Sequence, residues 1–164
     1  MNKAPEIQCD GWNDGETVPI AYTAPREANI QPPGNPQPEN KRPEFTFSHV
    51  PAGTRSIALV VHDVLDGEPI NGERPGWTHY TALFSPEGLL LEEGDTSETE
   101  KGWVGPYPED SGEYHCTAFF LSKRFTEGSF SRAEILNEYD RHGLAQANII
   151  GKYTNPLSTK ELLN

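Results

Sequence analysis

The placement of glycine and proline is the feature that most constrains what this chain can fold into. The sequence has 15 glycines and 15 prolines among 164 residues, and they separate apolar segments instead of forming one low-complexity tract. Because both residues interrupt helices and favour turns, this spacing is typical of a β-rich chain with long loops. In the densest stretch, residues 31–43, repeated proline excludes helix and central strand, which leaves an ordered loop or a flexible surface excursion.

The length of the chain and its lack of long apolar runs indicate one domain that acts away from membranes. A chain of 164 residues can bury a single core, so we expect residues 1–164 to form one domain. The sequence has no apolar run of about 18 residues for a membrane span, and its first residues lead into no apolar signal-peptide segment. We therefore expect a soluble, cytoplasmic protein.

The charge and the cysteines exclude several classes of partner and site. A formal net charge of −12 and a pI near 4.7 argue against nucleic acid and anionic membrane surfaces, which are bound through clustered lysine and arginine. Cys9 and Cys116 are too few for the disulfide framework of a small secreted domain, and they show no C-x-x-C spacing. We expect two free thiols, with Cys116 as a small core residue.

Four apolar segments predict β-strands: Phe45–Ser48 and residues 56–62, 77–84 and 115–122. Residues 56–61 form a continuous apolar run that is rich in β-branched side chains. Such a run is typical of a central strand that is covered on both faces, so we expect it in the interior of a sheet.

Alternation within two of these segments places a histidine on an otherwise largely apolar face. In residues 115–122, one face consists of His115, Thr117, Phe119 and Leu121. The opposite face of that segment consists of Cys116, Ala118 and Phe120. In residues 77–84, the face with the second histidine consists of Trp77, His79, Thr81 and Leu83.

One helix has clear boundary signals. Residues 131–134, Ser-Arg-Ala-Glu, form a capping box in which the serine hydroxyl and the glutamate carboxylate satisfy amides of the first turn. Gly143 is a plausible terminator. We expect residues 145–150 to end a helical segment that turns into a last strand through Tyr153. An apolar stripe supports the helix and consists of Ile135, Leu136 and Tyr139.

An acidic segment precedes the last predicted strand pair. Residues 92–113 hold eight acidic side chains against the single Lys101. Because like charges repel and keep a segment in water, the simplest interpretation is a solvated loop. The alternative is an acidic rim that shapes access to a pocket.

Three side chains are candidates for a functional site: Asp63, His79 and His115. Asp63 follows the apolar run of residues 56–62, where it is either a turn residue that bonds nearby amides or the partner of an imidazole. Each histidine alone could be a core residue with both nitrogens satisfied. Two histidines at equivalent strand positions, with an aspartate on a third strand, favour convergence on one small polar pocket.

A convergent pair of imidazoles suits either an anion or a metal ion. When charged, His79 and His115 offer donors to a phosphate or carboxylate oxygen. When neutral, they offer two metal ligands, with Asp63 as a third. The metal alternative has weak support, because the chain lacks H-x-x-x-H and H-x-H spacing at these residues.

Binding has more support in the sequence than catalysis. The chain has no G-x-S-x-G elbow, phosphate-cradling glycine-rich loop or dinucleotide fingerprint, and alternation turns Cys116 away from His115. The alternative function is a hydrolase or isomerase that uses His79 or His115 as a general base, with or without a divalent metal.

Seven segments in order resemble one known family. Outside the candidate pocket, residues 14–23 are similar to its opening "D-G-x-x-[IV]-P-x-x-Y-T", residues 43–56 to "S-P-x-L-x-W-x-x-x-P-x-G-T-K-S", and residues 144–153 to "L-A-x-A-x-x-x-G-x-Y". The pocket segments follow in the family order. Residues 62–69 stand where the family has "D-P-D-A-P" and residues 77–79 where it has "W-x-H". Residues 105–108 match "G-P-x-P", and residues 115–119 stand where it has "H-R-Y-x-F". The chain thereby resembles the phosphatidylethanolamine-binding protein family, in its bacterial and archaeal Raf-kinase-inhibitor-like branch.

The resemblance implies a mainly β fold, an antiparallel β-sandwich of Greek-key type with a few short helices. It implies a non-catalytic pocket for a small anionic ligand, which can be phosphate, a carboxylate or a phospholipid headgroup, and it implies no cofactor. A protein partner in regulation and a homodimer are further expectations. The pocket residues carried over by position are Asp63, His79 and His115, with walls from Trp77, Gly105, Pro106 and Tyr107.

Two departures from the family pattern affect this pocket. Residues 63–69 are longer than the motif "D-P-D-A-P", so the loop after Asp63 is expected to be reshaped. The "R-Y" after the second histidine is Cys116-Thr117, which removes a cation and replaces an aromatic hydroxyl with a short one. We expect Thr117 to enlarge the pocket floor and Tyr107 to supply the lost ring from the opposite wall.

Overall fold

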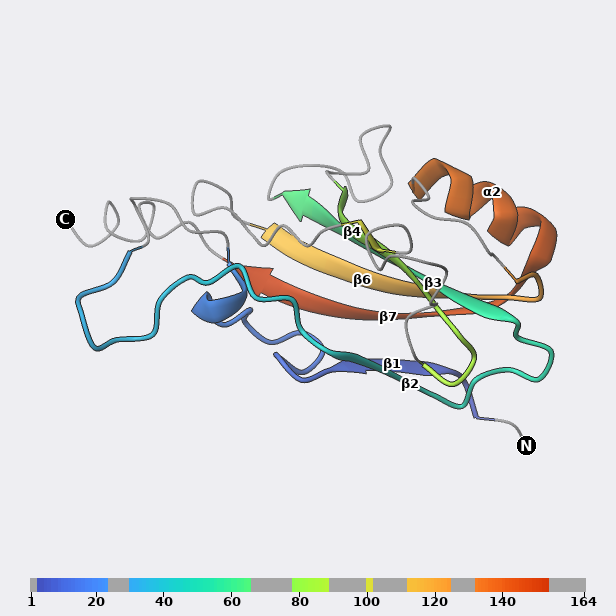
Figure 1. Ribbon diagram of the computed structural model, residues 1–164, viewed down its shortest axis with the longest axis horizontal. Coiled ribbons are helices and arrows are strands. Elements are labelled where there is room, and N and C mark those ends of the chain that lie inside the picture. The colour runs from blue at the N-terminus through green and yellow to red at the C-terminus, as the bar shows by residue number, and fades with distance from the viewer. Residues whose placement is uncertain are drawn as a thin grey trace.

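The computed structural model describes residues 3–23, 30–65, 78–88, 100–101, 112–124 and 132–153 (Figure 1). Within these residues the chain forms strands, one 3-10 helix and one α-helix. The elements in chain order are β1 (Glu6–Cys9), η1 (Ile20–Tyr22), β2 (Phe45–Ser48), β3 (Ser56–Leu65), β4 (Thr78–Phe84), β5 (Glu100–Lys101), β6 (Gly112–Leu121), α2 (Arg132–His142) and β7 (Gly143–Tyr153).

The strands form two antiparallel sheets. The larger sheet has five strands in the order β5-β4-β3-β6-β7, and β1 pairs with β2 in a smaller sheet. Because β6 returns to lie beside β3 after β4 and β5, the order β6-β3-β4-β5 is that of a Greek key. Figure 1 shows the small sheet on one side of the large one and α2 on the other. The predicted mainly β, antiparallel sandwich is confirmed.

Strand β3 is the middle strand of the large sheet, as its apolar run predicts. Ile57, Leu59 and Val61 belong to the core that faces β1 and β2, whereas Ala58 and Val60 belong to the core on the opposite face. Each of these five side chains is at most 1% exposed. We call the first face of the sheet the inner face and the second the helix face.

The inner face packs against the small sheet through aromatic contacts. The ring of Phe47 on β2 lies 5.0 Å from that of Phe84 on β4 and 6.3 Å from that of Phe120 on β6, both in edge arrangements. Such edge-to-face pairs add to the stabilisation from area burial alone. The side chains of Cys116, Ala118 and Phe120 lie on this face, as alternation predicts.

The helix face packs against α2. Ile135 is 1% exposed in a cluster with Phe119 and Leu121 of β6, and the ring of Tyr139 lies 5.2 Å from that of Phe119. The helix ends at His142 and β7 begins at Gly143, which confirms the predicted terminator; the predicted capping serine lies outside the described residues. Neither of the helices in the described part of the chain is long and apolar enough to cross a bilayer.

The prediction that residues 145–150 end a helical segment is wrong. These residues belong to β7, which pairs with β6 so that Ala145 lies opposite Phe120 and Ile149 opposite Cys116. Alanine and glutamine favour helix locally, but pairing with β6 and burial of alternate side chains decide the outcome. The sequence reading also did not predict β1 and η1, which are short and only partly apolar.

The proline-rich stretch is an ordered excursion in its described part. Residues 30–44 contain neither helix nor strand, as predicted. They are attached to the 3-10 helix by the N–H groups of Glu39 and Lys41, which both donate to the carbonyl of Ala21 at 3.2 and 2.9 Å. Of the acidic segment, only residues 100–101 and 112–113 are described, so the choice between loop and rim lies outside the described residues.

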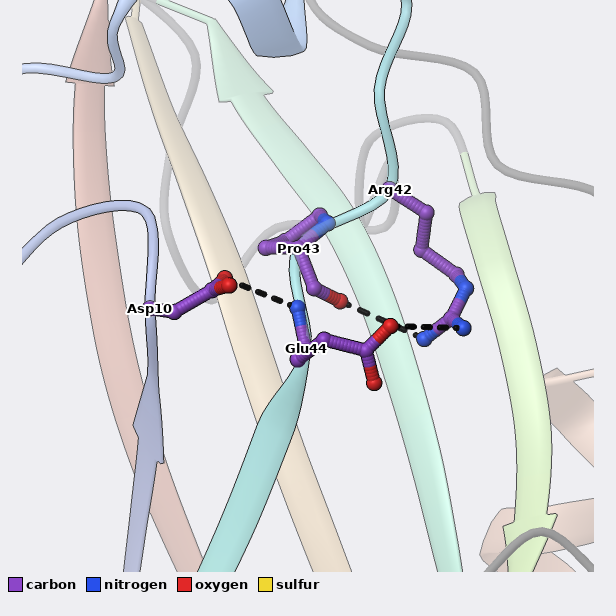
Figure 2. A network of polar contacts seen from close by, with 4 residues as sticks. All are labelled: Asp10, Arg42, Pro43 and Glu44. Atoms are coloured by element: carbon purple, nitrogen blue, oxygen red, sulfur yellow. Dashed lines mark hydrogen bonds and ion pairs between the residues drawn. The ribbon is translucent and has the colours of Figure 1, made fainter.

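A polar network joins the ends of β1 and β2 (Figure 2). The N–H of Asp10 donates to the carbonyl of Glu44 at 3.1 Å, and the N–H of Glu44 donates to Asp10 Oδ1 at 2.9 Å. Arg42 donates to the carbonyl of Pro43 at 3.3 Å and pairs with the Glu44 carboxylate at 3.4 Å, while its guanidinium lies 5.9 Å from the ring centre of Tyr80. Arg42 therefore links the small sheet to β4 of the large one.

Candidate ligand site

Two histidines face each other across β3 and β6. His62 lies directly opposite His115 in the antiparallel register. Their ring centroids are 5.3 Å apart and their planes are tilted by 38°. Because directly opposite residues of an antiparallel pair share a face, both imidazoles lie on the helix face, on the side of Val60 and Thr117.

Glu113 completes this pair at the end of β6. His115 Nε2 lies 3.1 Å from Glu113 Oε1, and the two residues are two positions apart, so they share the helix face. The side chain of His115 is 13% exposed and that of Glu113 is 32% exposed. The contact is a hydrogen bond from the imidazole to the carboxylate, and it becomes an ion pair when the imidazole is charged.

A row of polar side chains lies next to the histidines on the same face. Thr81, Val60, Thr117 and Asn148 are at one level across β4, β3, β6 and β7. Asn148 Nδ2 donates to Thr117 Oγ1 at 3.4 Å. Thr81 Oγ1 is buried and has no hydrogen-bond partner within the described part of the chain. The floor beside the imidazoles therefore presents hydroxyl and amide groups at one level.

The described contacts of α2 lie further along the helix face. Its side chains pack against Phe119 and Leu121, and His115 lies four residues before Phe119 on β6. Four residues of strand span roughly 13 Å. We call the part of this face that holds the imidazoles its polar end.

His79 lies at an irregularity in β4, at the same level of the sheet. Val61 lies opposite Tyr80 and His62 opposite Thr78, so His79 is the extra residue of a β-bulge. Since β3 lies between β4 and β6, the backbones of His79, His62 and His115 follow one another across three adjacent strands. The remaining predicted wall residues lie outside the described residues: Trp77, Gly105, Pro106 and Tyr107.

Asp63 has a different position from the one that its sequence context suggests. It lies within β3, which continues to Leu65, and it is 3% exposed, so it is not a turn residue. In the register it lies opposite Tyr114, whose side chain belongs to the inner core. Alternation therefore places Asp63 on the inner face, and the structure does not bring it beside His115.

His62 is the residue that the sequence reading missed. It belongs to the same segment as Asp63, and the signal that could have found it is the alternation of β3 itself, in which His62 shares a face with Ala58 and Val60.

Cys116 lies on the opposite face from the imidazoles, as predicted. It is a free thiol with no exposed surface, and burial raises the pKa of this thiol well above its usual value. A buried thiol of this kind is a poor nucleophile. Among the residues that the structure describes, no group of three or more His, Cys, Asp or Glu side chains is placed to hold a metal ion.

The comparison with known families decides the identity of the fold. The pattern that defines the phosphatidylethanolamine-binding proteins matches residues 10–154 of the chain. The chain belongs to the phosphatidylethanolamine-binding protein family. His115 and Thr117 both lie in β6.

Bacterial relatives have the same fold over almost their whole length. A Chlamydia muridarum protein described as UPF0098 protein is 25% identical over 160 residues, which cover 90% of this chain and 97% of the relative. The crystal structure of CT736 of Chlamydia trachomatis, a phosphatidylethanolamine-binding protein homologue, has a TM-score of 0.67 at 23% identity and covers 93% of this chain and 98% of its own. YbcL of E. coli has a TM-score of 0.61 at 19% identity, with 93% and 99% covered. These structures support the family's fold for this chain.

Proposed function

We propose that the chain binds small anions through the polar end of the helix face and has no catalytic turnover. The carrying observation is the pair of imidazoles, His62 and His115, with ring centroids 5.3 Å apart above a floor that contains Thr117. Protonated imidazoles donate from both nitrogens, and charge-assisted hydrogen bonds to an oxyanion are among the strong ones. Phosphate, a carboxylate or a phospholipid headgroup supplies such oxygens.

The contact with Glu113 orients one of the two imidazoles. Because Nε2 of His115 bonds the Glu113 carboxylate, Nδ1 is the nitrogen left for a ligand, and it has no partner among the described residues. In this proposal His62 and His115 hold the same oxyanion from two strands, and the Thr117 hydroxyl donates from the floor. Glu113 positions His115 and does not contact the ligand.

The other predicted residues complete the proposed pocket. His79 contributes a third imidazole from the bulge in β4, and the walls come from Trp77, Gly105, Pro106 and Tyr107. Asp63 stays a predicted site residue. Because Asp63 lies on the inner face and the imidazoles lie on the helix face, substitutions of Asp63 and of the histidines test the two faces separately.

Titration of the protein with inorganic phosphate and with phosphoethanolamine tests the proposal. We expect saturable shifts of the ring signals of His62 and His115 in NMR spectra, and binding that weakens as pH rises through the range in which imidazoles ordinarily titrate. His115→Gln is expected to weaken binding, and His49→Asn, an exposed histidine outside the site, is the matched control.

Three outcomes contradict the proposal: no shift at either ring, affinity that does not change with pH, or equal loss of affinity in His49→Asn. The variant Asp63→Asn shows on which face of β3 the ligand binds. If it loses as much affinity as His115→Gln, the ligand lies on the inner face. Hydrolysis of phosphoesters that disappears in His115→Gln would favour a catalytic function instead.

The wider context of the binding function is also part of the proposal. A regulatory protein partner, a homodimer and a cytoplasmic location follow from the resemblance to the Raf-kinase-inhibitor-like branch. Affinity purification with His115→Gln as the control, sedimentation of the purified chain and fractionation of cells test these three statements separately.

A further inference from the structure

Within the described part of the chain, the outer edge of β7 is paired at one end and open at the other. At its C-terminal end, Ile150 N–H donates to Asp14 Oδ1 at 2.8 Å, and Gly15 N–H donates to the Ile150 carbonyl at 2.7 Å. Lys152 is paired in the same way, because its N–H donates to the Glu16 carbonyl at 2.9 Å and its carbonyl accepts from Val18 N–H at 2.8 Å. The segment that precedes η1 thus covers this end of the edge.

The same alternation leaves Gln146 and Asn148 open. Because Ile150 and Lys152 direct their backbone groups away from β6, every second residue before them does the same, and the register with β6 is regular from Ala145 to Tyr153. Both Gln146 and Asn148 are exposed, and their outward N–H and C=O groups have no partner among the described residues. An open edge of this kind is a template for another strand.

A groove lies beside this open edge. It has a volume of about 470 Å³ and runs between β1 and β7, which lie side by side in Figure 1. Ala147 and Ile149 lie on one wall and Ile7 and Trp12 on the other, while the rest of the lining is mostly polar or ionisable. This volume lies within the range of small-ligand sites and also accommodates alternate side chains of an extended segment.

The charge around the groove selects the kind of segment. Of the described residues that line it, the ionisable ones are Glu6, Cys9 and Asp14, and none is a lysine or arginine. Glu16, in the segment that covers the paired end of the edge, adds another carboxylate. Carboxylates on the rim complement cationic side chains and repel acidic ones.

We propose that the groove between β1 and β7 binds an extended basic peptide segment, which pairs with the edge of β7 at Gln146 and Asn148. The backbone groups of these two residues supply two donors and two acceptors to the peptide. Alternate apolar side chains of the peptide enter the groove, and its cationic side chains lie near Glu6 and Asp14. This site is on the β1 side of β7, and it shares Asn148 with the floor of the proposed anion site: the peptide would use the backbone of Asn148, and its side chain bonds Thr117.

An eight-residue peptide of alternating lysine and valine, with blocked ends, is the probe. Titrated into the full-length protein, it is expected to give saturable shifts of the amides of Gln146 and Asn148 and of the Trp12 indole N–H, with slower hydrogen exchange at the two amides. The matched peptide of alternating glutamate and valine is expected to bind at least tenfold more weakly. Glu6→Gln should weaken the lysine peptide about two- to fivefold, and Glu87→Gln, an exposed glutamate away from the groove, should not.

Two further measurements isolate the strand pairing. Gln146→Pro removes an outward donor without removing a hydrogen bond to β6, and it is expected to weaken the lysine peptide at least tenfold. If this variant does not fold, a peptide with alternate N-methylated valines makes the same test on the native protein. An N-methylated peptide that binds as tightly as its parent would overturn the proposal.

The remaining outcomes also decide against the proposal. No saturable shift with the lysine peptide, or equal affinity for the glutamate peptide, rejects the charge argument. Shifts at Gln146 and Asn148 that depend on protein concentration alone would mean that a second copy of the chain takes the edge.

Discussion

His62 lies directly opposite His115 on the helix face, with ring centroids 5.3 Å apart. Two imidazolium ions at this separation repel each other, whereas an oxyanion between them is attracted to both. In the proposed function, one oxyanion is held by both rings.

A double-mutant cycle should show that the two histidines act as one unit on phosphate. His62→Gln and His115→Gln are each expected to weaken phosphate binding about tenfold, roughly 1.4 kcal/mol, and the double variant should lose less than the sum. Calorimetric titration near pH 6 measures the three affinities. Strict additivity would mean that the two rings contact the ligand independently or that one of them does not contact it.

Gly151 of β7 is packed closely against the segment between β1 and η1. A Cβ atom at this position would lie 2.5 Å from Val18 Cγ2 and 2.8 Å from the indole of Trp12. Gly151→Ala is therefore expected to lower the free energy of unfolding by about 1–3 kcal/mol, because the packed neighbours must move. Urea denaturation measures the change.

The control for this variant is Gly34→Ala. Gly34 has a φ of +93° and no atom within 4 Å of the added Cβ, so its cost is limited to backbone strain. We expect a loss of about 1 kcal/mol there. A smaller loss at Gly151 than at Gly34 would contradict the close approach of Trp12.

Ile135 is the side chain through which α2 is anchored to the helix face. It is 1% exposed, whereas its neighbour Leu136 is 36% exposed. Ile135→Ala is expected to lower the free energy of unfolding by about 2–4 kcal/mol, and Leu136→Ala by less than about 1 kcal/mol. Thermal denaturation of the two variants measures the difference. Equal effects would mean that a different side of α2 packs against the helix face of the sheet.

The two thiols are expected to differ in reactivity. They are also expected to make the free energy of unfolding fall at alkaline pH. Burial raises the pKa of Cys116 well above its usual value and raises that of Cys9 as well. Because the folded state favours the protonated thiol, this stabilisation is fully present below the unfolded-state pKa of about 8.5 and is lost as pH rises above it. Urea denaturation between neutral and alkaline pH measures the slope.

Cys116→Ala supplies the control for the alkaline effect. We expect this variant to start from a lower stability because of the lost packing, and to show a shallower decrease with rising pH. In the wild-type protein, a thiol reagent should modify half-buried Cys9 slowly and Cys116 only after unfolding. Rapid modification of both thiols in the folded protein would contradict the burial of Cys116.

Local patterns in the sequence predicted much of the fold. The apolar run in β3 predicted a central strand, and alternation in β6 predicted which side chains share a face with His115. Both predictions follow from properties of a single strand: side chains alternate between its two faces, and a continuous apolar run indicates burial on both faces. The ordered family segments likewise predicted the antiparallel sandwich.

The pairing between strands could not be predicted in the same way. A shift of one residue between β3 and β6 exchanges which of His62 and Asp63 lies beside His115, and nothing within either strand sets that shift. The same limit applies to β7. Its alanines and glutamine are part of a strand because they pair with the edge of β6.

The sequence by itself therefore determined the β-rich class, the central strand, the faces of β6 and the family to which the chain belongs. Only the tertiary structure decided that His62 is the partner of His115 and that Asp63 lies on the inner face. The physical reason is that alternation is a property of one strand, whereas register depends on the packing of the whole sheet against its two cores.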